Sequence, residues 1–382
     1  MKRRHFVIAA ATAAVAVAAL LAGRNLGPRE RPAAPGYEQE LADVTASMKW
    51  YDANAERKGS SALAQSLAAG AHLERARLTG DYDEYAAAER WIGRAFAAAP
   101  QGAGPFMDRA GFSFTLHRFD RMENDLASAE KSILMDDPGR AAVEGLRADL
   151  LLQRGQTAEA IRGMTDALAL HDSPQGWSRL AHAYWLDGDL KRAAECYGTA
   201  LLMDHGRRES GRAWIFLQKG LMALSVRDLD GALAEYRKAD ARFPGWWLIQ
   251  EHIAEALALQ GKTAEAESRY RDLIRRTNDP EFMDALARID LKKGRKDEAQ
   301  IWVARAEKIY QDRLKRFPEA TWGHALRHYL DLGDAKIALE LAEKNWKLRP
   351  NRESGDLLEA ARRRVGAVTT RAASPPQGGR TS

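Results

Sequence analysis

The chain has 382 residues, of which 45% are hydrophobic and 29% are charged, and its formal net charge is +5. The positive charge lies at the ends, because residues 1–32 and residues 361–382 each carry a net +5, which leaves −5 for the body between them. A mildly acidic body argues against a nucleic acid partner, since nucleic acid binding depends on a basic surface. The single cysteine, Cys196, excludes an internal disulfide and is predicted to be a buried structural thiol.

An apolar segment opens the chain. Basic residues 2–4 precede an uncharged apolar run over residues 6–22. A charged region followed by a hydrophobic region is typical of a targeting segment, so residues 1–23 are predicted to be a signal or anchor and are excluded from the fold. Because positive charge stays in the cytoplasm, the body is expected to lie outside it.

Whether this segment is cleaved depends on the residues at its C-terminal end. A small-x-small cleavage site is poorly formed, and Arg24 stands where a lipid-bearing cysteine would be required. An uncleaved anchor is therefore favoured over a cleaved signal peptide. Arg3, Arg4 and Phe6 resemble a twin-arginine export signal, although ordinary basic flanking charge also accounts for them. Residues 24–36 are rich in proline and glycine and are predicted to be a linker.

Residues 37–140 show helical periodicity with weak landmarks. Residues 76–100 and residues 104–138 each have the pattern of a helix, a turn and a second helix that ends at a proline. We predict two or three divergent helical repeats here, because no alternating strand pattern interrupts the helical period. A separate small helical domain is the alternative.

Residues 174–207 carry the clearest pattern. Small and aromatic residues recur on one face of each of two predicted helices, which a turn at Gly188 joins. Small Ala181 and Ala193 allow two antiparallel helices to approach closely, while aromatic side chains fill the space beside them. The residues of the pattern are Trp177, Leu180, Ala181 and Tyr184 in the first helix and Ala193, Tyr197 and Ala200 in the second. This pattern resembles a tetratricopeptide repeat.

The pattern recurs at intervals of 33 to 39 residues, against a period of about 34 for this repeat. Five units have a glycine and, five residues later, an alanine: Gly155 and Ala160, Gly188 and Ala193, Gly261 and Ala266, Gly294 and Ala299, and Gly333 and Ala338. A sixth unit keeps Ala232 but has Arg227 at the glycine position, and Asp290 stands where another unit should have a large apolar residue. The resemblance implies six repeats within residues 141–350, two of them degraded. Since one hairpin cannot bury its apolar face alone, the expected fold is all-α, an α-solenoid of stacked antiparallel helix hairpins.

We assign the solenoid to residues 141–360. Two of its repeat spacings are 39 residues long, which indicates an insertion in each. One insertion is predicted to be a polar loop at residues 204–212, and the other an extension of a second helix through residues 308–317. Residues 365–382 have no core-forming pattern and are predicted to be a disordered tail.

The sequence contains no Gly-rich phosphate loop, GxSxG, HExxH or CxxC motif, so we predict neither an enzyme nor a cofactor. One group of residues in a predicted helix has the spacing of a possible metal site. His324, His328 and Asp331 share one helix face and offer two imidazoles and a carboxylate to a metal. Contacts with solvent, a ligand or the next helix explain these residues without a metal, so none is assigned. A metal-dependent enzyme that uses this face is kept as an alternative.

In tetratricopeptide repeats the first helix of each hairpin lines a concave groove, where extended segments dock. The resemblance therefore implies a partner-binding groove, although a solvated helix face explains each residue singly. The predicted groove residues are Gln175, Ser178, His182, Trp185, Glu251, Glu255, Asp284, Arg288, Arg327 and Asp331. Of these, His182, Glu255, Arg288 and Arg327 occupy equivalent ninth positions of their units. Trp246 and Trp247 are predicted to be a packing pair between repeats rather than an exposed ligand platform.

The resemblance implies a scaffold or assembly factor of the bacterial cell envelope that binds a protein partner. It is expected on the periplasmic side of the inner membrane, held by residues 1–23, or free in the periplasm if that segment is cleaved. Membrane contact is expected only through this segment, and no nucleic acid is expected as a partner. A carrier that holds a lipid or glycan in the groove is the remaining alternative.

Overall fold

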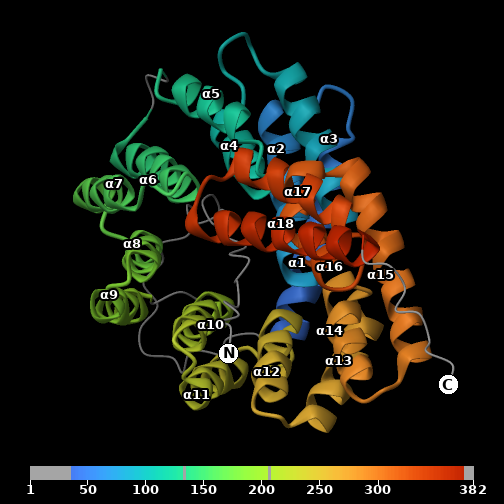
Figure 1. The fold of residues 1–382 in the computed structure, drawn as a ribbon. Helices are drawn as coiled ribbons and strands as arrows, with labels where there is room; N and C mark the ends of the chain where they lie inside the picture. Colours follow the sequence, from blue (N-terminus) through green and yellow to red (C-terminus); the bar gives the residue numbers. More distant parts are fainter. Residues whose placement is uncertain (1–35, 132–134, 205–207, 374–382) are drawn as a thin grey trace, which may run out of the picture. The chain divides into compact units, whose positions relative to one another are not determined.

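The computed structural model describes residues 36–131, 135–204 and 208–373. Over these ranges the chain forms eighteen helices and no strand, which confirms the all-α prediction (Figure 1). The helices are α1 (Tyr37–Ala55), α2 (Ala62–Thr79), α3 (Tyr82–Ala98), α4 (Phe106–Thr115), α5 (Phe119–Ala129), α6 (Asp137–Gln153), α7 (Thr157–Leu170), α8 (Pro174–Asp187), α9 (Leu190–Met203), α10 (Glu209–Ser225), α11 (Leu229–Arg242), α12 (Trp247–Leu259), α13 (Thr263–Thr277), α14 (Pro280–Lys292), α15 (Lys296–Arg316), α16 (Pro318–Asp331), α17 (Ala335–Leu348) and α18 (Arg352–Ala373).

The predicted targeting segment, the twin-arginine pattern and nearly all of the predicted linker lie in residues 1–35, outside the described residues. Among the helices that the structure describes, none has both the length and the apolar character needed to cross a membrane.

The hairpin of α8 and α9 shows why the sequence folds as it does. Ser173 caps α8 by accepting a hydrogen bond from the Gly176 N–H at 3.1 Å, and Pro174 occupies the first turn, where its missing N–H costs nothing. Gly188 ends α8 with φ of 94°, a left-handed conformation that favours glycine. Ala181 and Ala193 are fully buried, as the close approach of the two helices predicts.

The other predicted repeats are also helix pairs, from α6 with α7 to α16 with α17. Arg227, which replaces the glycine of its unit, adopts φ of 65° all the same. The turn therefore keeps its left-handed geometry, although a side chain with a Cβ is strained there. Cys196 is buried, as expected of a structural thiol.

Two segments are more helical than the sequence predicted. α10 begins at Glu209, so the last four residues of the predicted loop at residues 204–212 are helix. α18 runs to Ala373, so residues 365–373 belong to a helix and not to a disordered tail. The physical reason is that no proline interrupts this stretch before Pro375, and its three alanines and one arginine favour helix, so it can continue the helix that begins at Arg352. The extended second helix before Pro318 is confirmed as α15.

The described helices group into two compact units. The first unit contains the residues up to 152 and residues 156–278, and the second contains residues 153–155 and the residues from 279. This division falls within the predicted solenoid. The predicted boundary near residue 140, which separates divergent from regular repeats, stays a prediction.

In the first unit, α1 and α2 contact helices that lie far along the chain. Several contacts join them: for example, the Ser210 hydroxyl donates to Glu40 at 2.8 Å, the Tyr37 ring meets the Phe243 ring edge to face at 5.7 Å, and the Arg77 guanidinium lies 5.5 Å from the Trp246 ring. Trp246 is fully buried, as predicted for a packing residue. Its neighbours include α2 as well as the preceding repeat, so the first unit is held by more than nearest-neighbour stacking.

Candidate functional site

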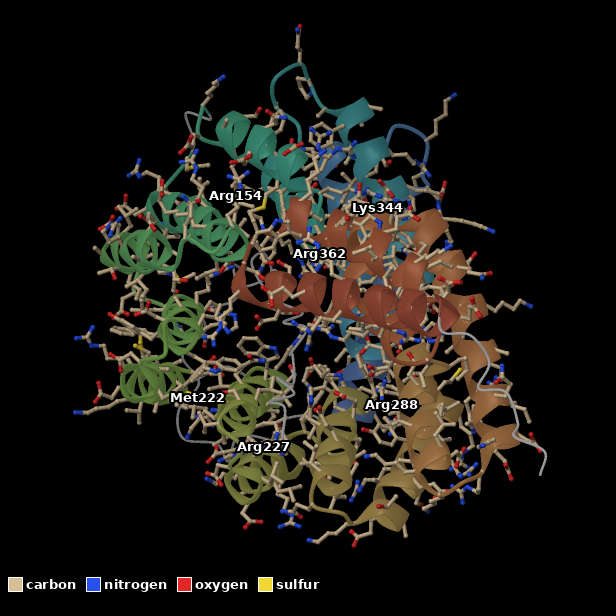
Figure 2. All side chains as sticks on the ribbon, in the orientation of Figure 1. Arg154, Met222, Arg227, Arg288, Lys344 and Arg362 are labelled. Atoms are coloured by element: carbon tan, nitrogen blue, oxygen red, sulfur yellow. The ribbon has the colours of Figure 1, made fainter. Side chains whose placement is uncertain are left out.

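The ninth positions of four repeats share one property. Each side chain is partly exposed and directly follows a side chain with 0% exposure, because it lies at the edge of the buried stripe of its helix. The pairs of buried and partly exposed residues are Ala181 and His182 on α8, Ala254 and Glu255 on α12, Ala287 and Arg288 on α14, and Leu326 and Arg327 on α16. Figure 2 shows the side chains as sticks and labels Arg288, one of these four partly exposed residues.

Three other predicted groove residues are buried. Ser178, Trp185 and Asp284 have exposed fractions of 6%, 8% and 3%. The indole N–H of Trp185 donates to the Ser225 hydroxyl at 3.0 Å. Burial withdraws these three side chains from solvent, whereas Gln175 is exposed. Partner contact stays a prediction for the exposed and partly exposed members.

Three pairs of side chains join α14 to α16 in the second unit. The pairs are Glu281 with His324, Asp284 with His328 at 2.8 Å, and Arg288 with Asp331 at 3.5 Å. The three residues of α16 are those weighed as metal ligands in the sequence. Their partners show that they face α14, which is the contact with the next helix that the sequence offered as the explanation without a metal.

The middle pair is the most buried. His328 Nδ1 lies 2.8 Å from one carboxylate oxygen of Asp284, and the Tyr310 hydroxyl donates to the other oxygen at 3.2 Å. Burial raises the pKa of Asp284, although the hydrogen bond with His328 opposes this shift. His328 Nε2 is buried and has no hydrogen-bond partner among the described residues. Asp284, His328 and Tyr310 are all buried, so this contact is closed to solvent.

His182 lies on the first helix of the best repeat, at the edge of its core. Its Nδ1 is buried and has no hydrogen-bond partner within the described residues, and its ring meets the Trp185 ring edge to face at 5.3 Å. Burial lowers the pKa of His182 to about 4 from its ordinary value of 6.5, because the charged imidazolium loses its hydration there.

This shift predicts a pH dependence. Between pH 6.5 and about 4 the unfolded chain binds a proton at His182 and the folded chain does not, so stability falls as the pH drops through this range. We expect a loss of at most about 3.4 kcal/mol over the whole range, at 1.36 kcal/mol for each pKa unit. Urea unfolding of the wild type and of His182→Leu at pH 7 and pH 4.5 measures it. The variant should lose less stability than the wild type, and equal losses would contradict the assignment.

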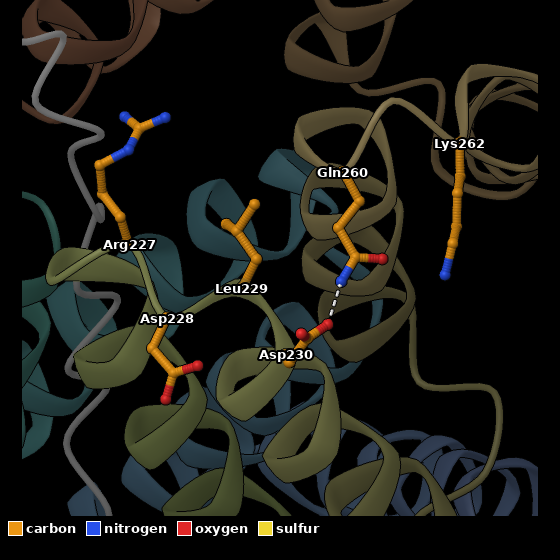
Figure 3. A pocket seen from close by; sticks show the side chains of 6 residues that line it. All are labelled: Arg227, Asp228, Leu229, Asp230, Gln260 and Lys262. Atoms are coloured by element: carbon orange, nitrogen blue, oxygen red, sulfur yellow. Dashed lines mark hydrogen bonds between the residues drawn. The ribbon is translucent and has the colours of Figure 1, made fainter.

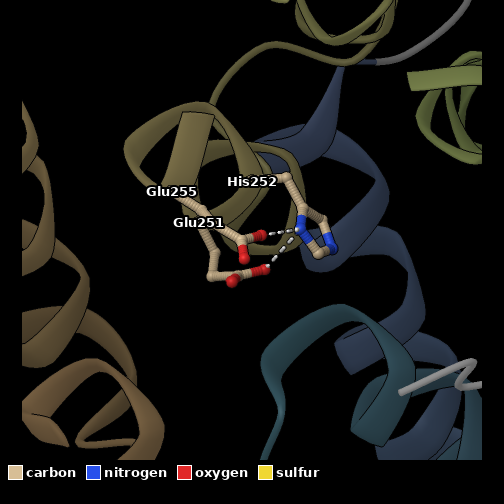
Figure 4. A group of neighbouring side chains, drawn as sticks. All are labelled: Glu251, His252 and Glu255. Carbon is tan, nitrogen blue, oxygen red and sulfur yellow. Dashed lines mark hydrogen bonds and ion pairs between the residues drawn. The ribbon is translucent and has the colours of Figure 1, made fainter. Parts of the chain in front are cut away.

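The structure brings together a group that the sequence interpretation missed. Glu251, His252 and Glu255 project from one side of α12 (Figure 4). His252 Nδ1 lies 3.1 Å from a Glu251 oxygen and 3.4 Å from a Glu255 oxygen, and all three side chains are partly buried. The signal in the sequence is a glutamate pair spaced i and i+4 with a histidine at i+1. Only the glutamates were assigned, as groove residues.

A shallow depression lies where α11 and α13 begin (Figure 3). Basic Arg227 and Lys262 and acidic Asp228 and Asp230 line it, and the Gln260 amide donates to Asp230 at 2.7 Å. The mixed charges partly cancel, and the site is open to solvent. It therefore has no preference for one class of charged ligand.

Comparison with known proteins supports the repeat assignment. Residues 174–204 match the family model of the tetratricopeptide repeat. No curated protein matches the chain. The chain therefore contains a tetratricopeptide repeat at the place where the sequence pattern is clearest.

Solved structures are similar in fold. A human IFIT1 dimer with m7Gppp-AAAA has a TM-score of 0.50 and 16% identity, over 85% of this chain and 77% of that chain. A tetratricopeptide repeat protein of Parabacteroides merdae has a TM-score of 0.41 and 17% identity, over 67% and 97% of the two chains. Pseudomonas aeruginosa pilF has a TM-score of 0.39 and 17% identity, over 59% and 98%. At such identities the likeness concerns the fold alone.

Proposed function

We propose that this tetratricopeptide repeat chain is a scaffold or assembly factor of the cell envelope, and that it binds an extended segment of a protein partner through the first helices of its hairpins. The observation that supports the proposal is the exposure of the ninth positions. His182, Glu255, Arg288 and Arg327 follow fully buried residues, so their backbone positions are fixed while their side chains are partly exposed, although Nδ1 of His182 is buried. Fixed polar side chains on rigid helices are suited to recognise a partner.

Replacement of His182, Glu255, Arg288 and Arg327 by alanine should reduce recovery of the main partner in an affinity pull-down from membranes. Thermal stability should change little at pH 7, because the Arg288 and Arg327 ion pairs are partly exposed and such pairs contribute about 0–1 kcal/mol each. A matched control replaces Arg162, Lys238, Lys344 and Arg363, whose ion pairs are exposed and stay within one helix. Equal recovery with both variants would contradict the proposed surface.

The proposed location rests on the charge order of residues 1–23, which is typical of a segment whose following chain is translocated out of the cytoplasm. Alkaline phosphatase fused to the C-terminus should therefore be active, since this enzyme requires export. The protein should also stay with membranes after a carbonate wash. An inactive fusion would contradict the topology, whereas an active fusion released by carbonate would indicate cleavage in place of an anchor.

The metal-dependent enzyme on the His324, His328 and Asp331 face is not favoured by the geometry. His328 is fully buried, and all three residues contact α14. The carrier alternative differs from the scaffold in a simple observable, because a lipid or glycan carrier should retain its cargo through purification. Mass spectrometry of an extract of the purified protein distinguishes the two functions.

A further inference from the structure

The three side chains that project together from α12 have the geometry of a metal site. A tetrahedral metal with bonds of about 2.0–2.1 Å holds its ligand atoms about 3.3 Å apart. His252 Nδ1 lies 3.1 Å and 3.4 Å from its two glutamate oxygens, and the three ligand atoms lie within 4.8 Å of one another. An imidazole nitrogen and two carboxylate oxygens therefore need little movement to surround one ion.

A second observation comes from α11. The Tyr236 ring stacks on the His252 ring with centroids 5.6 Å apart and an angle of 25° between the planes. The Tyr236 side chain is fully buried, and within the described part of the chain its hydroxyl has no hydrogen-bond partner. His252 therefore contacts this buried ring as well as the two carboxylates of its own helix.

The donor set selects the class of ion. Zinc accepts nitrogen and carboxylate oxygen together, and sites with three protein ligands keep a fourth position open. Magnesium and calcium prefer sets of oxygen ligands with higher coordination numbers, so the imidazole disfavours them. The stacked Tyr236 ring restricts the rotation of His252, which keeps the imidazole next to the glutamates without metal.

We infer that Glu251, His252 and Glu255 bind one divalent cation of the zinc class, with a fourth coordination position left for water or for a donor atom of a ligand. This site goes beyond the proposed scaffold function. Its test requires no partner, so failure of the metal site and failure of partner binding are distinguishable.

The test is calorimetric titration of the purified, metal-free and tag-free chain with Zn²⁺, followed by the absorption spectrum of the Co²⁺ form. One Zn²⁺ should bind per chain, and Mg²⁺ at the same concentration should not compete. Glu255→Gln keeps the shape of the side chain and the stacked histidine, and it should weaken Zn²⁺ binding more than about tenfold, because even partners outside the ligand shell affect affinity by 10- to 100-fold. His252→Ala should remove the Co²⁺ absorption bands of tetrahedral coordination.

His324→Ala is the matched control, because His324 pairs with a single carboxylate, that of Glu281. This variant should bind Zn²⁺ as the wild type does. Circular dichroism without metal checks that each variant is folded. Wild-type affinity in both Glu255→Gln and His252→Ala would place the ion elsewhere and overturn the inference, as would the absence of Zn²⁺ binding by the wild-type chain.

Discussion

Trp246→Ala is expected to lower the free energy of unfolding of the first unit by about 3–5 kcal/mol, the usual cost of deleting a buried aromatic side chain. Trp246 is fully buried and packs against Phe243 of its own repeat junction and against Arg77 of α2. Its loss should therefore loosen α2 as well as α12. Urea unfolding measures the cost, and hydrogen exchange should show faster exchange in α2.

Trp50→Ala is the control for this variant, because Trp50 lies on α1 with an exposed fraction of 62%. Its replacement should change stability by about 0.5 kcal/mol or less. A cost for Trp246→Ala as small as that of Trp50→Ala would show that α2 does not pack on Trp246. Faster exchange confined to α11 and α12 would contradict the contact between the N-terminal helices and the later repeats.

His328→Leu is expected to lower the stability of the second unit by about 3–5 kcal/mol. Without His328 the buried Asp284 carboxylate has no ion-pair partner. The loss of stability from such an unpaired buried charge is larger than the net stability that the intact pair contributes. Thermal and urea unfolding at pH 7 measure this loss.

A second substitution tests the reason for the loss. Adding Asp284→Asn to His328→Leu removes the buried charge but keeps an acceptor for the Tyr310 hydroxyl, so it should restore a large part of the stability. The effects of the two substitutions should be strongly non-additive, as expected of residues in contact. Additive losses would show that the pair is not coupled in the folded chain.

The repeat pattern predicted the helices well because it records local packing. Small residues at Ala181 and Ala193, and the glycine turn at Gly188, are requirements of one hairpin and are visible within about 30 residues. Asp290 is a position where the repeat pattern fails to predict the structure. The sequence marks it as a defect in the pattern, but its buried carboxylate accepts a hydrogen bond from Arg295 at 2.9 Å across the turn. A pattern of apolar positions does not anticipate a polar substitute.

Contacts between distant segments could not be predicted from the repeat pattern. Tyr37 meets Phe243 across roughly two hundred residues, and no periodic signal links them. The candidate site residues likewise fall into a part that the repeat pattern predicts and a part that depends on distant contacts. The ninth positions follow from the repeat, whereas the burial of Asp284 depends on His328 and Tyr310 from other helices. Glu251, His252 and Glu255 lie within five consecutive residues, so their spacing is visible in the sequence, but the spacing alone does not show that the three side chains converge.

The three pairs between α14 and α16 also determine which repeats can be neighbours. Along α14 the charged side chains are Glu281, Asp284 and Arg288. Their partners along α16, in the same order, are His324, His328 and Asp331. If α16 slid by one turn so that Asp331 faced Asp284, two carboxylates would meet in a buried setting, which is strongly unfavourable. The repeats of a solenoid contact only their neighbours, so a junction between purely apolar faces can accept an exchanged unit. The junction between α14 and α16 requires a neighbour with the matching order of charges. The two repeats from α14 to α17 should therefore be kept together as one block when they are transplanted into another solenoid.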